Sequence, residues 1–503
     1  MRDLYARAEF TAAGDAYDSA VAQGAMPSAE DDLLRAQLLL KHDENRAVAF
    51  LIRRPPRSSG GQQRGRWELW LAVGYARMRD FERADHHFEL AQRLLNASED
   101  RATLAYQLAR RWMLEGNLEE AWRHADEMSV DRSLGTKIRG EMLRSFIYCQ
   151  SERYRESAQT VMDALRLIGK HRDDYLEEWF HAVQNLALLT RELSFDEAAE
   201  VARREVDADV LWPEDYRTQR FQALKAVGWS CALRGDMLGC FRYLRMAERV
   251  IPGEAFRAIL LLDRAHFARI VGEPTWALDE IAKAENLEEN VDWKALAGEE
   301  RVCLLLLAEA TAPLNRERAR YYLARYKGLD KFRSPVHLFA FDHRLEAFST
   351  YTEGVVRAAA NDEAGAEEAL RRAWSIFDRI GYDWRAARAA IQLYALTKKD
   401  RWRHLAEDKL EAFPRSWLAQ ELRQPVASAP TVKLPPMQGK VFSMLCQKMT
   451  TAEIAQELGL SQHTVRNHLK AVFRAFGVNN RAALIAEAAS RGELPASTRN
   501  AGL

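Results

Sequence analysis

The sequence predicts an all-α fold, in which a long α-solenoid of helix pairs precedes a small four-helix domain. Two observations predict this fold. A motif of two short amphipathic helices returns at similar intervals along most of the 503 residues. The C-terminal part instead holds four short helices with start and stop signals of their own. A chain of this length has room for several domains or for one long repeat array.

The repeated motif is clearest in LAVGYARMRDFERADHHFELA, residues 71–91. The apolar side chains of its first helix fall on one face, at Leu71, Ala72 and Tyr75. A polar break follows, and a second helix then places Phe81, Ala84, Phe88 and Ala91 on one face. A small side chain such as that of Ala84 allows two helices to cross closely. We therefore expect a helix pair whose crossing point is this residue.

A small residue occupies the same place in each later copy of the motif. These positions are Ala84, Ala121, Ser157, Ala198, Cys240, Ala277 and Ala319, with successive separations of 37, 36, 41, 42, 37 and 42 residues. The pattern resembles the tetratricopeptide repeat, with loops slightly longer than that repeat's period of roughly 34 residues. The resemblance covers about residues 68–326, and residues 367–396 continue the rhythm. It implies a curved stack whose concave surface binds a protein or peptide ligand, and an α-solenoid of another lineage would give a similar surface.

Several tryptophans lie at helical spacing in this region. They are Trp67, Trp70, Trp112, Trp122, Trp179, Trp229 and Trp276. We expect most of them in the hydrophobic core and not along a binding groove. The composition of residues 54–66, RPPRSSGGQQRGR, predicts an exposed loop.

The domain boundaries follow from composition. We expect the helical-repeat domain over residues 1–423, acting as a sensor or scaffold, and a linker over residues 424–436, where Pro and small residues end the helical pattern. The four-helix domain is expected over residues 437–491, with a disordered tail over residues 492–503. The N-terminus has no apolar signal segment, and no apolar run reaches the length of a membrane span. Five widely spaced Cys indicate reduced, mostly buried thiols, so a cytoplasmic protein without membrane association is expected.

The C-terminal domain begins with a supporting helix over residues 440–449. In TTAEIAQELGL, residues 450–460, Thr450 and Glu453 have the spacing of a capping box, and Gly459 ends the second helix. Ser461 then provides an N-cap for a third helix that stops at Gly477. Two helices joined by a tight turn with Gly have helix-turn-helix geometry, in which the second helix enters the major groove of DNA. A fourth helix is expected over residues 479–492.

The third helix has two different faces. Its apolar stripe comprises Val465, Leu469, Val472, Phe473 and Phe476. The opposite stripe holds His463, Arg466, Asn467, Lys470 and Arg474, without an acid. Residues 434–491 carry a net charge of +4 within a chain whose formal charge is zero, so residues 1–433 carry −4. This asymmetry suggests a nucleic-acid module on an otherwise acidic protein.

These four helices resemble the LuxR-type (GerE-like) DNA-binding domain. The matching string is Thr450, Glu453, Ile454, Ala455, Leu458, Leu460, Ser461, Thr464, Val465, His468, Leu469, Phe473, Gly477, Val478, Asn480 and Arg481. Residues 434–438, LPPMQ, depart from the Leu-Thr-x-Arg-Glu-like opening of the family, with Pro435 and Gln438 at the usual Thr and Glu positions. Ala483 replaces a commonly acidic residue in the last helix. Neither departure removes the groove-reading surface.

The resemblance implies a set of DNA-binding residues. Arg466, Asn467 and Lys470 occupy positions that face base edges and nearby phosphates. Ser461, Gln462 and Thr464 lie at the N-terminal end of the helix, where hydroxyl and N–H groups suit phosphate, and His463 of the basic stripe is also counted as DNA-binding. Further phosphate contacts are expected from Thr450, Thr451, Arg474 and Arg481. His468 points between the two faces, and a structural hydrogen bond is as consistent with its place as a DNA contact.

Motifs of enzyme chemistry are missing from the sequence. It contains no GxxxxGK[ST] phosphate loop, no HExxH, no GxSxG and no paired Cys-His spacing. HRDD at residues 171–174 mimics a kinase fragment, but no downstream Asn or DFG follows. We therefore expect no enzymatic activity, no metal and no cofactor.

The sequence thus predicts a bacterial transcription regulator that binds double-stranded DNA at specific sequences. Members of the resembled family usually bind as dimers, so a cytoplasmic, nucleoid-associated homodimer is expected. The helical-repeat domain would bind a protein or peptide and control the DNA-binding domain, and RNA polymerase is a further candidate partner. The alternative is a protein-interaction adaptor, in which the repeats bind a partner and the C-terminal domain mainly dimerises.

Overall fold

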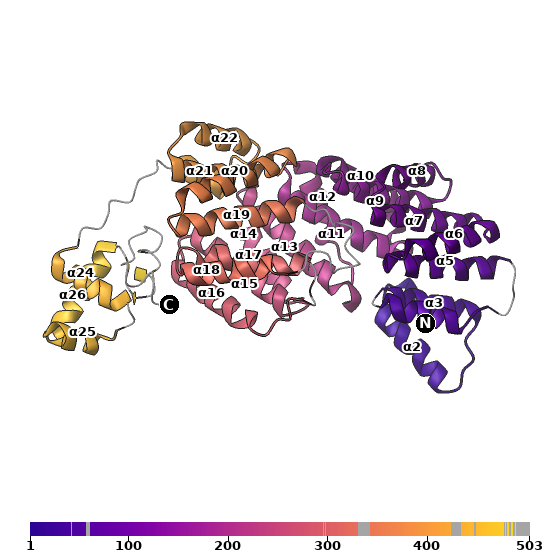
Figure 1. Ribbon diagram of the computed structural model, residues 1–503, viewed down its shortest axis with the longest axis horizontal. Coiled ribbons are helices and arrows are strands. Elements are labelled where there is room, and N and C mark those ends of the chain that lie inside the picture. Colours follow the sequence, from indigo (N-terminus) through magenta and orange to yellow (C-terminus); the bar gives the residue numbers. More distant parts are fainter. Residues whose placement is uncertain are drawn as a thin grey trace. The chain divides into compact units, whose positions relative to one another are not determined.

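The computed structural model describes residues 1–41, 43–56, 61–294, 296, 298–329, 343–423, 434–446 and 449–476, together with Val478, Asn480, Arg481, Leu484, Ile485 and Ala488. Helices are the only regular secondary structure within these residues, as the sequence predicts (Figure 1). The chain divides into two compact units, the first from Met1 to Ser230 and the second from Cys231 onward.

The first unit consists of consecutive short helices. They are α1 (Arg2–Ala6), α2 (Phe10–Ala22), α3 (Ala29–Leu40), α4 (Glu44–Arg53), α5 (Gln62–Arg77), α6 (Phe81–Leu94), α7 (Ser98–Glu115), α8 (Leu118–Ser129), α9 (Leu134–Gln150), α10 (Tyr154–Ile168), α11 (Leu176–Glu192) and α12 (Asp196–Val206). Two 3₁₀ helices interrupt the series, η1 (Gly169–Asp174) and η2 (Glu214–Tyr216), and α13 (Arg217–Leu233) crosses into the second unit.

The second unit continues the series of helices. It contains α14 (Met237–Glu248), α15 (Glu254–Ile270), α16 (Pro274–Glu288), α17 (Gly298–Thr311), α18 (Arg316–Lys327), α19 (His343–Ala359), α20 (Glu363–Arg379), α21 (Asp383–Thr397), α22 (Asp400–Leu410) and α23 (Trp417–Arg423). After residues outside the described part come α24 (Pro436–Cys446), α25 (Thr451–Leu458) and α26 (Gln462–Phe476).

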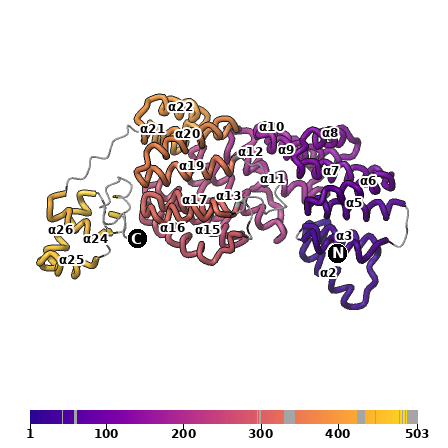
Figure 2. Tube along the Cα trace, viewed as in Figure 1, coloured from indigo at the N-terminus to yellow at the C-terminus, as the bar shows by residue number. Residues whose placement is uncertain are grey.

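Packing between the helices is that of an α-solenoid. Successive helices pack as pairs, such as α5 with α6 and α15 with α16, and Figure 2 shows these pairs following one another along the chain. The first helix of each pair also packs on the first helix of the next, with α5 on α7, α7 on α9 and α9 on α11 in the first unit. The second unit repeats this arrangement in α15, α17 and α19. Because each pair contacts mainly its neighbours, the array has the nearest-neighbour packing of repeat proteins.

The small residues of the repeat motif lie near the start of the second helix of each pair. Each is the third or fourth residue of the second helix of its pair. All seven are completely buried: Ala84, Ala121, Ser157, Ala198, Cys240, Ala277 and Ala319 each expose 0% of their surface. Ala366 occupies the same position in α20 and also exposes 0%. The complete burial of these side chains agrees with the predicted close approach of the paired helices.

Several of the turns between paired helices share a local mechanism. In α7–α8, Gly116 adopts a left-handed φ of 91°, a conformation that costs Gly little, and the Asn117 side chain then accepts from the amide of Glu120 at 3.2 Å. In α13–α14, Gly235 has a φ of 84° and Asp236 accepts from the Gly239 amide at 2.8 Å. One residue thus ends the first helix and the next caps the second, which fixes the short connection.

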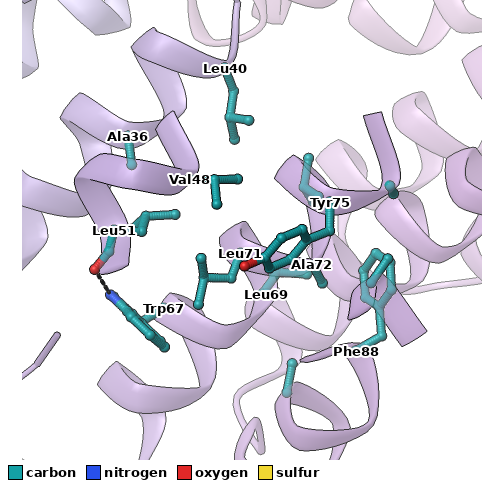
Figure 3. Close-up of a cluster of buried hydrophobic side chains, with 14 of the residues drawn as sticks. Ala36, Leu40, Val48, Leu51, Trp67, Leu69, Leu71, Ala72, Tyr75 and Phe88 are labelled. Carbon is teal, nitrogen blue, oxygen red and sulfur yellow. Dashed lines mark hydrogen bonds between the residues drawn. The ribbon is translucent and has the colours of Figure 1, made fainter. Parts of the chain in front are cut away.

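Three of the seven tryptophans singled out in the sequence are buried, which agrees with the core role expected for them. Trp67 is 8% exposed and its indole nitrogen donates to the main-chain oxygen of Leu51 at 3.1 Å, within the cluster drawn in Figure 3. Trp179 and Trp229 are also buried. The other four, Trp70, Trp112, Trp122 and Trp276, are half-buried. Four of the five Cys are buried as predicted, and Cys149 is half-buried.

The prediction of an exposed loop over residues 54–66 is wrong for residues 62–66. Gly61 is the N-cap of α5, so residues 62–66 form the first turn of this helix. Gly65 is buried there against the side chains of Leu94 and Leu95, where a Cβ would come within 3.0 Å of atoms of either residue. Residues 57–60 lie outside the described part, as do residues 424–433 of the predicted linker and the predicted tail. None of the described helices is long and apolar enough to cross a membrane.

Replacing the crossing residue Ala121 with Leu tests this packing. Because Ala121 has no exposed surface, the larger side chain must force α7 and α8 apart, with an expected loss of about 1–3 kcal/mol in the free energy of unfolding. Thermal unfolding followed by circular dichroism measures the effect. Ala20→Leu, at an exposed position of α2, is the matched control and should leave the unfolding midpoint nearly unchanged. Equal midpoints for both variants would contradict the assigned crossing.

Candidate nucleic-acid interface

Helices α24, α25 and α26 enclose one small hydrophobic core. Its fully buried members include Val441 of α24, Ile454 of α25 and Val465 and Val472 of α26, each with 0% exposure. The rings of Phe442 and Phe476 lie 5.2 Å apart between centroids. Of the predicted fourth helix only a few residues are described, and Leu484 and Ala488 are buried in the same core. The inward positions predicted from helical periodicity are therefore confirmed where they are described.

The turn between α25 and α26 is determined locally. Thr450 and Glu453 form the predicted capping box, in which the Thr450 amide donates to the Glu453 carboxylate at 2.6 Å and the Glu453 amide donates to Thr450 Oγ1 at 3.3 Å. These bonds hold the pKa of the Glu453 carboxyl below its usual value. Gly459 ends α25 with a left-handed φ of 64°, and the Leu460 amide donates to the Ala455 carbonyl at 2.9 Å. The chain is thereby turned directly into α26.

Ser461 starts α26 as predicted. Its Oγ accepts from the Thr464 amide at 3.1 Å and lies 2.8 Å from Thr464 Oγ1. The Ser461 carbonyl accepts from the Val465 amide at 3.1 Å, which is the first bond of the helix. The remaining amides of the first turn point out of the helix end, where they suit an anion.

α26 separates its apolar and polar side chains between two faces. Val465, Leu469, Val472 and Phe476 are buried, and Phe473 is half-buried against the same core. The exposed residues of the opposite face are Gln462, His463, Arg466, Asn467, Lys470 and Arg474. Thr464 and His468 are half-buried. The two stripes read from the sequence are therefore present, and the packing of α26 leaves its cationic stripe in solvent.

The cations of this exposed stripe lack acidic partners. Arg466, Lys470 and Arg474 form no ion pair with any described residue. The two acids among the described residues of the domain, Glu453 and Glu457, both lie in α25, and Glu453 is engaged in the capping box. An unpaired row of cations on one rigid helix attracts polyanions such as the DNA backbone.

The other predicted site residues lie in three places. Thr450 is exposed at the start of α25 with the half-buried Thr451 beside it, and Ser461 is exposed at the start of α26. Arg481 is different, because it is half-buried and donates from Nη1 to the Met449 carbonyl at 3.3 Å and from Nη2 to the Leu445 carbonyl at 2.5 Å. These carbonyls lie at and just beyond the C-terminal end of α24, where helices leave acceptors unsatisfied. Helical periodicity does not reveal this role of Arg481, since its acceptors lie 32 and 36 residues earlier.

Comparison with known families identifies this domain. The model of the family described as "Bacterial regulatory proteins, luxR family" matches residues 434–488. Over 55 residues the chain is 44% identical to the spore germination protein GerE of Bacillus subtilis (strain 168), an alignment that covers 11% of this chain and 74% of that protein. The chain belongs to the luxR family of bacterial regulatory proteins. As a luxR-family protein it is a DNA-binding transcription regulator and not an enzyme.

Two solved structures of helical proteins are distantly similar to this luxR-family chain. The Cut9–Hcn1 hetero-tetramer of APC/C is 15% identical, with a TM-score of 0.29 over 78% of this chain and 83% of that chain. The apo form of the quorum sensor NprR from B. thuringiensis is 13% identical, with a TM-score of 0.34 over 68% of this chain and 97% of that chain. The description of the repeat region therefore rests on the packing of its own helices.

Substituting Arg481 by Ala tests whether this side chain stabilises the luxR-type domain or contacts DNA. The loss of two bonds to main-chain carbonyls should lower the free energy of unfolding of the luxR-type domain by about 1–3 kcal/mol. Thermal unfolding measures this change, and DNA affinity is measured well below the transition, where the variant is folded. Arg474→Ala, at an exposed position, is the control and should leave stability within about 0.5 kcal/mol. A fully stable Arg481→Ala protein would refute the supporting role.

Proposed function

We propose that this luxR-family protein binds specific DNA sequences through α26, and that its helical-repeat region controls this binding in response to a protein or peptide ligand. The observation that carries the first part is the exposed cationic stripe of α26 in a domain of this family. Major-groove width admits one α-helix, and the apolar stripe fixes α26 to its core while the polar stripe faces outward.

Base recognition is assigned to the middle of the exposed stripe. The Arg466 guanidinium has the geometry for paired hydrogen bonds to guanine O6 and N7, and the Asn467 amide for adenine N6 and N7. Lys470 lies one turn further along the same face and reaches a base edge or a neighbouring phosphate. Because Arg466 has no internal ion pair among the described residues, no partner has to be released before it binds DNA.

Phosphate contacts are assigned to the ends of this surface. The N-terminal end of α26 is surrounded by Ser461, Gln462, His463 and Thr464. The N-terminal end of α25 is surrounded by Thr450 and Thr451. Amides and hydroxyls at both helix ends favour anions. Arg474 adds a cation near the C-terminal end of α26. For Arg481 we assign to phosphate only the N–H groups that its two bonds to main-chain carbonyls leave over.

The proposal extends to assembly and location. A homodimer on a two-fold symmetric DNA site fits a small domain that reads only a few base pairs, because two half-sites multiply specificity. We place the protein in the bacterial cytoplasm, associated with the nucleoid, with RNA polymerase as a further partner. Control by a bound protein or peptide is supported by the stacked helix pairs, an architecture that offers an extended surface to ligands.

Replacing Arg466 and Lys470 together by Ala tests the assigned surface. Removal of one base contact and a second cation should weaken specific binding by about 2–5 kcal/mol, which a mobility-shift assay detects as loss of the complex. The target sequence is first obtained by selection from random duplexes. Arg93→Ala with Arg401→Ala removes two exposed cations from the repeat region and serves as the charge-matched control.

Unchanged affinity of the Arg466→Ala, Lys470→Ala protein would refute the assigned surface. A wild-type protein that selects no sequence, yet purifies with a stoichiometric protein partner, would instead support the adaptor function, in which the C-terminal domain mainly dimerises.

Deleting residues 1–423 tests whether the repeat region controls DNA binding or is needed for it. The luxR-type domain has its own core, so the fragment should fold and retain specific binding, with affinity altered only by the loss of control. Circular dichroism checks the fold, and titration of the selected duplex measures affinity. A folded fragment that no longer discriminates between sequences would show that the repeat region contributes to recognition itself.

A further inference from the structure

The first unit contains a pocket of about 330 Å³ on the repeat stack. Helices α5, α7 and α11 supply Arg77, Arg110, Glu177 and His181 to its wall, and Lys41 follows α3. The apolar part of the lining consists of Phe10, Val73, Ala76, Phe88, Leu114 and Tyr216. This volume lies at the lower end of the range for small-molecule sites, in which a mostly apolar lining surrounds a few converging polar groups.

The N-terminal helices close one side of this pocket. Thr11, in the first turn of α2, donates its amide to the carboxylate of Asp215 at 3.1 and 3.2 Å, and its hydroxyl bonds to the same carboxylate. Asp215 belongs to η2 and lies 204 residues further along the chain. Phe10 and Tyr216 meet beside this contact with their ring centroids 5.9 Å apart. The wall is thus built from segments distant in sequence.

Two of the four cations that line the pocket are neutralised by carboxylates. Lys41 Nζ lies 2.7 Å from Glu177 Oε1. Arg111 is paired twice, with Asp85 Oδ2 at 2.6 Å and with Glu115. Among the lining residues Asp215 is the only other carboxylate, and it accepts the bonds from Thr11.

The other two cations, Arg77 and Arg110, form no ion pair with a described residue. Arg77 donates to the main-chain carbonyl of Leu40, and Arg110 lies over the ring of Tyr106 at 5.6 Å. Burial, and then the charge of Arg110, lower the pKa of Arg77 to about 10, so that it still carries its charge at neutral pH. Two like charges therefore lie in one partly buried wall, and neither forms an ion pair with a described residue.

Neutral polar groups complete the pocket. Burial lowers the pKa of His181, so the imidazole adds no further positive charge at neutral pH. Gln219 lines the pocket, and its Oε1 is buried without a hydrogen bond to any described residue. A buried acceptor without a donor is costly, and a ligand N–H or O–H group would satisfy it.

We infer that this pocket binds a small organic anion, with its carboxylate or phosphate against Arg77 and Arg110 and its apolar part against Phe88, Val73 and Leu114. The limited volume and the wall formed by α2 and η2 favour a free small molecule over the end of a long peptide. The site goes beyond the proposed function and does not rest on it, because it is defined by residues of the first unit alone.

Isothermal titration calorimetry on the full chain tests the site without DNA present, so failure of DNA binding cannot affect the outcome. The probes are phenylacetate and phenyl phosphate, with phenylacetamide as the neutral counterpart of the first. The tripeptide Gly-Gly-Phe, with a free or an amidated carboxyl end, represents a peptide source of the same carboxylate. Variants are Arg110→Gln and Arg77→Gln, and Arg93→Gln on the exposed surface of α6 is the control.

Binding of phenylacetate or phenyl phosphate, with no heat from phenylacetamide, is the expected result. Arg110→Gln and Arg77→Gln should each weaken that binding about tenfold or more, and Arg93→Gln should leave it unchanged. Because Arg77 also supports Leu40, Arg110→Gln carries the test if Arg77→Gln does not fold. Equal binding to Arg110→Gln, equal binding of the amide, or no binding of either anion overturns the inference. Binding of the free tripeptide alone would overturn it in favour of a peptide carboxylate.

Discussion

Most helix pairs of the repeat region place one small, completely buried side chain near the start of their second helix. A close approach of the two helices is possible there because Ala84, Ala121 and their counterparts have no exposed surface and no atoms beyond Cβ or a single γ atom. Larger side chains such as Phe88 and Tyr75 are buried in the same hydrophobic cluster as Ala84 (Figure 3). The first helices of neighbouring pairs then meet, and the array extends by repetition of one contact.

Three of the environments found among the described arginines differ in how far a carboxylate or carbonyl partner already occupies the charge. Arg111 is buried and paired with two carboxylates, which compensates its desolvation. Arg77 and Arg481 donate to main-chain carbonyls at or near helix ends, so they contribute to packing even without an acid. Arg466 and Arg474 are exposed, without an ion pair to a described residue. A ligand can use exposed cations such as Arg466 and Arg474. It can also use Arg77 and Arg110 in the pocket, which form no ion pair with a described residue.

The C-terminal domain shows how a small core presents a helix to a partner. α26 buries four apolar residues against α24 and α25, and this packing alone determines which residues of α26 face solvent. The capping box of Thr450 and Glu453 and the left-handed Gly459 set the angle between α25 and α26. Affinity for DNA in general follows from the cations, while discrimination between sequences requires the planar groups of Arg466 and Asn467 at fixed positions.

The sequence by itself determined the helix pairs, their crossing residues, the capping signals and the two faces of α26, because helix periodicity and end signals depend on neighbours within a few residues. It also sufficed for the luxR-type motif, whose residues lie close together in the chain. Only the tertiary structure decided that residues 62–66 belong to α5, that Arg481 supports α24, and that Thr11 joins Asp215 at one wall of a pocket containing Arg77 and Arg110. The bonds of Arg481 and Thr11 join residues 32 to 204 positions apart. Such pairs leave no period or spacing in the sequence, since they form only where the stacked helices bring distant segments together.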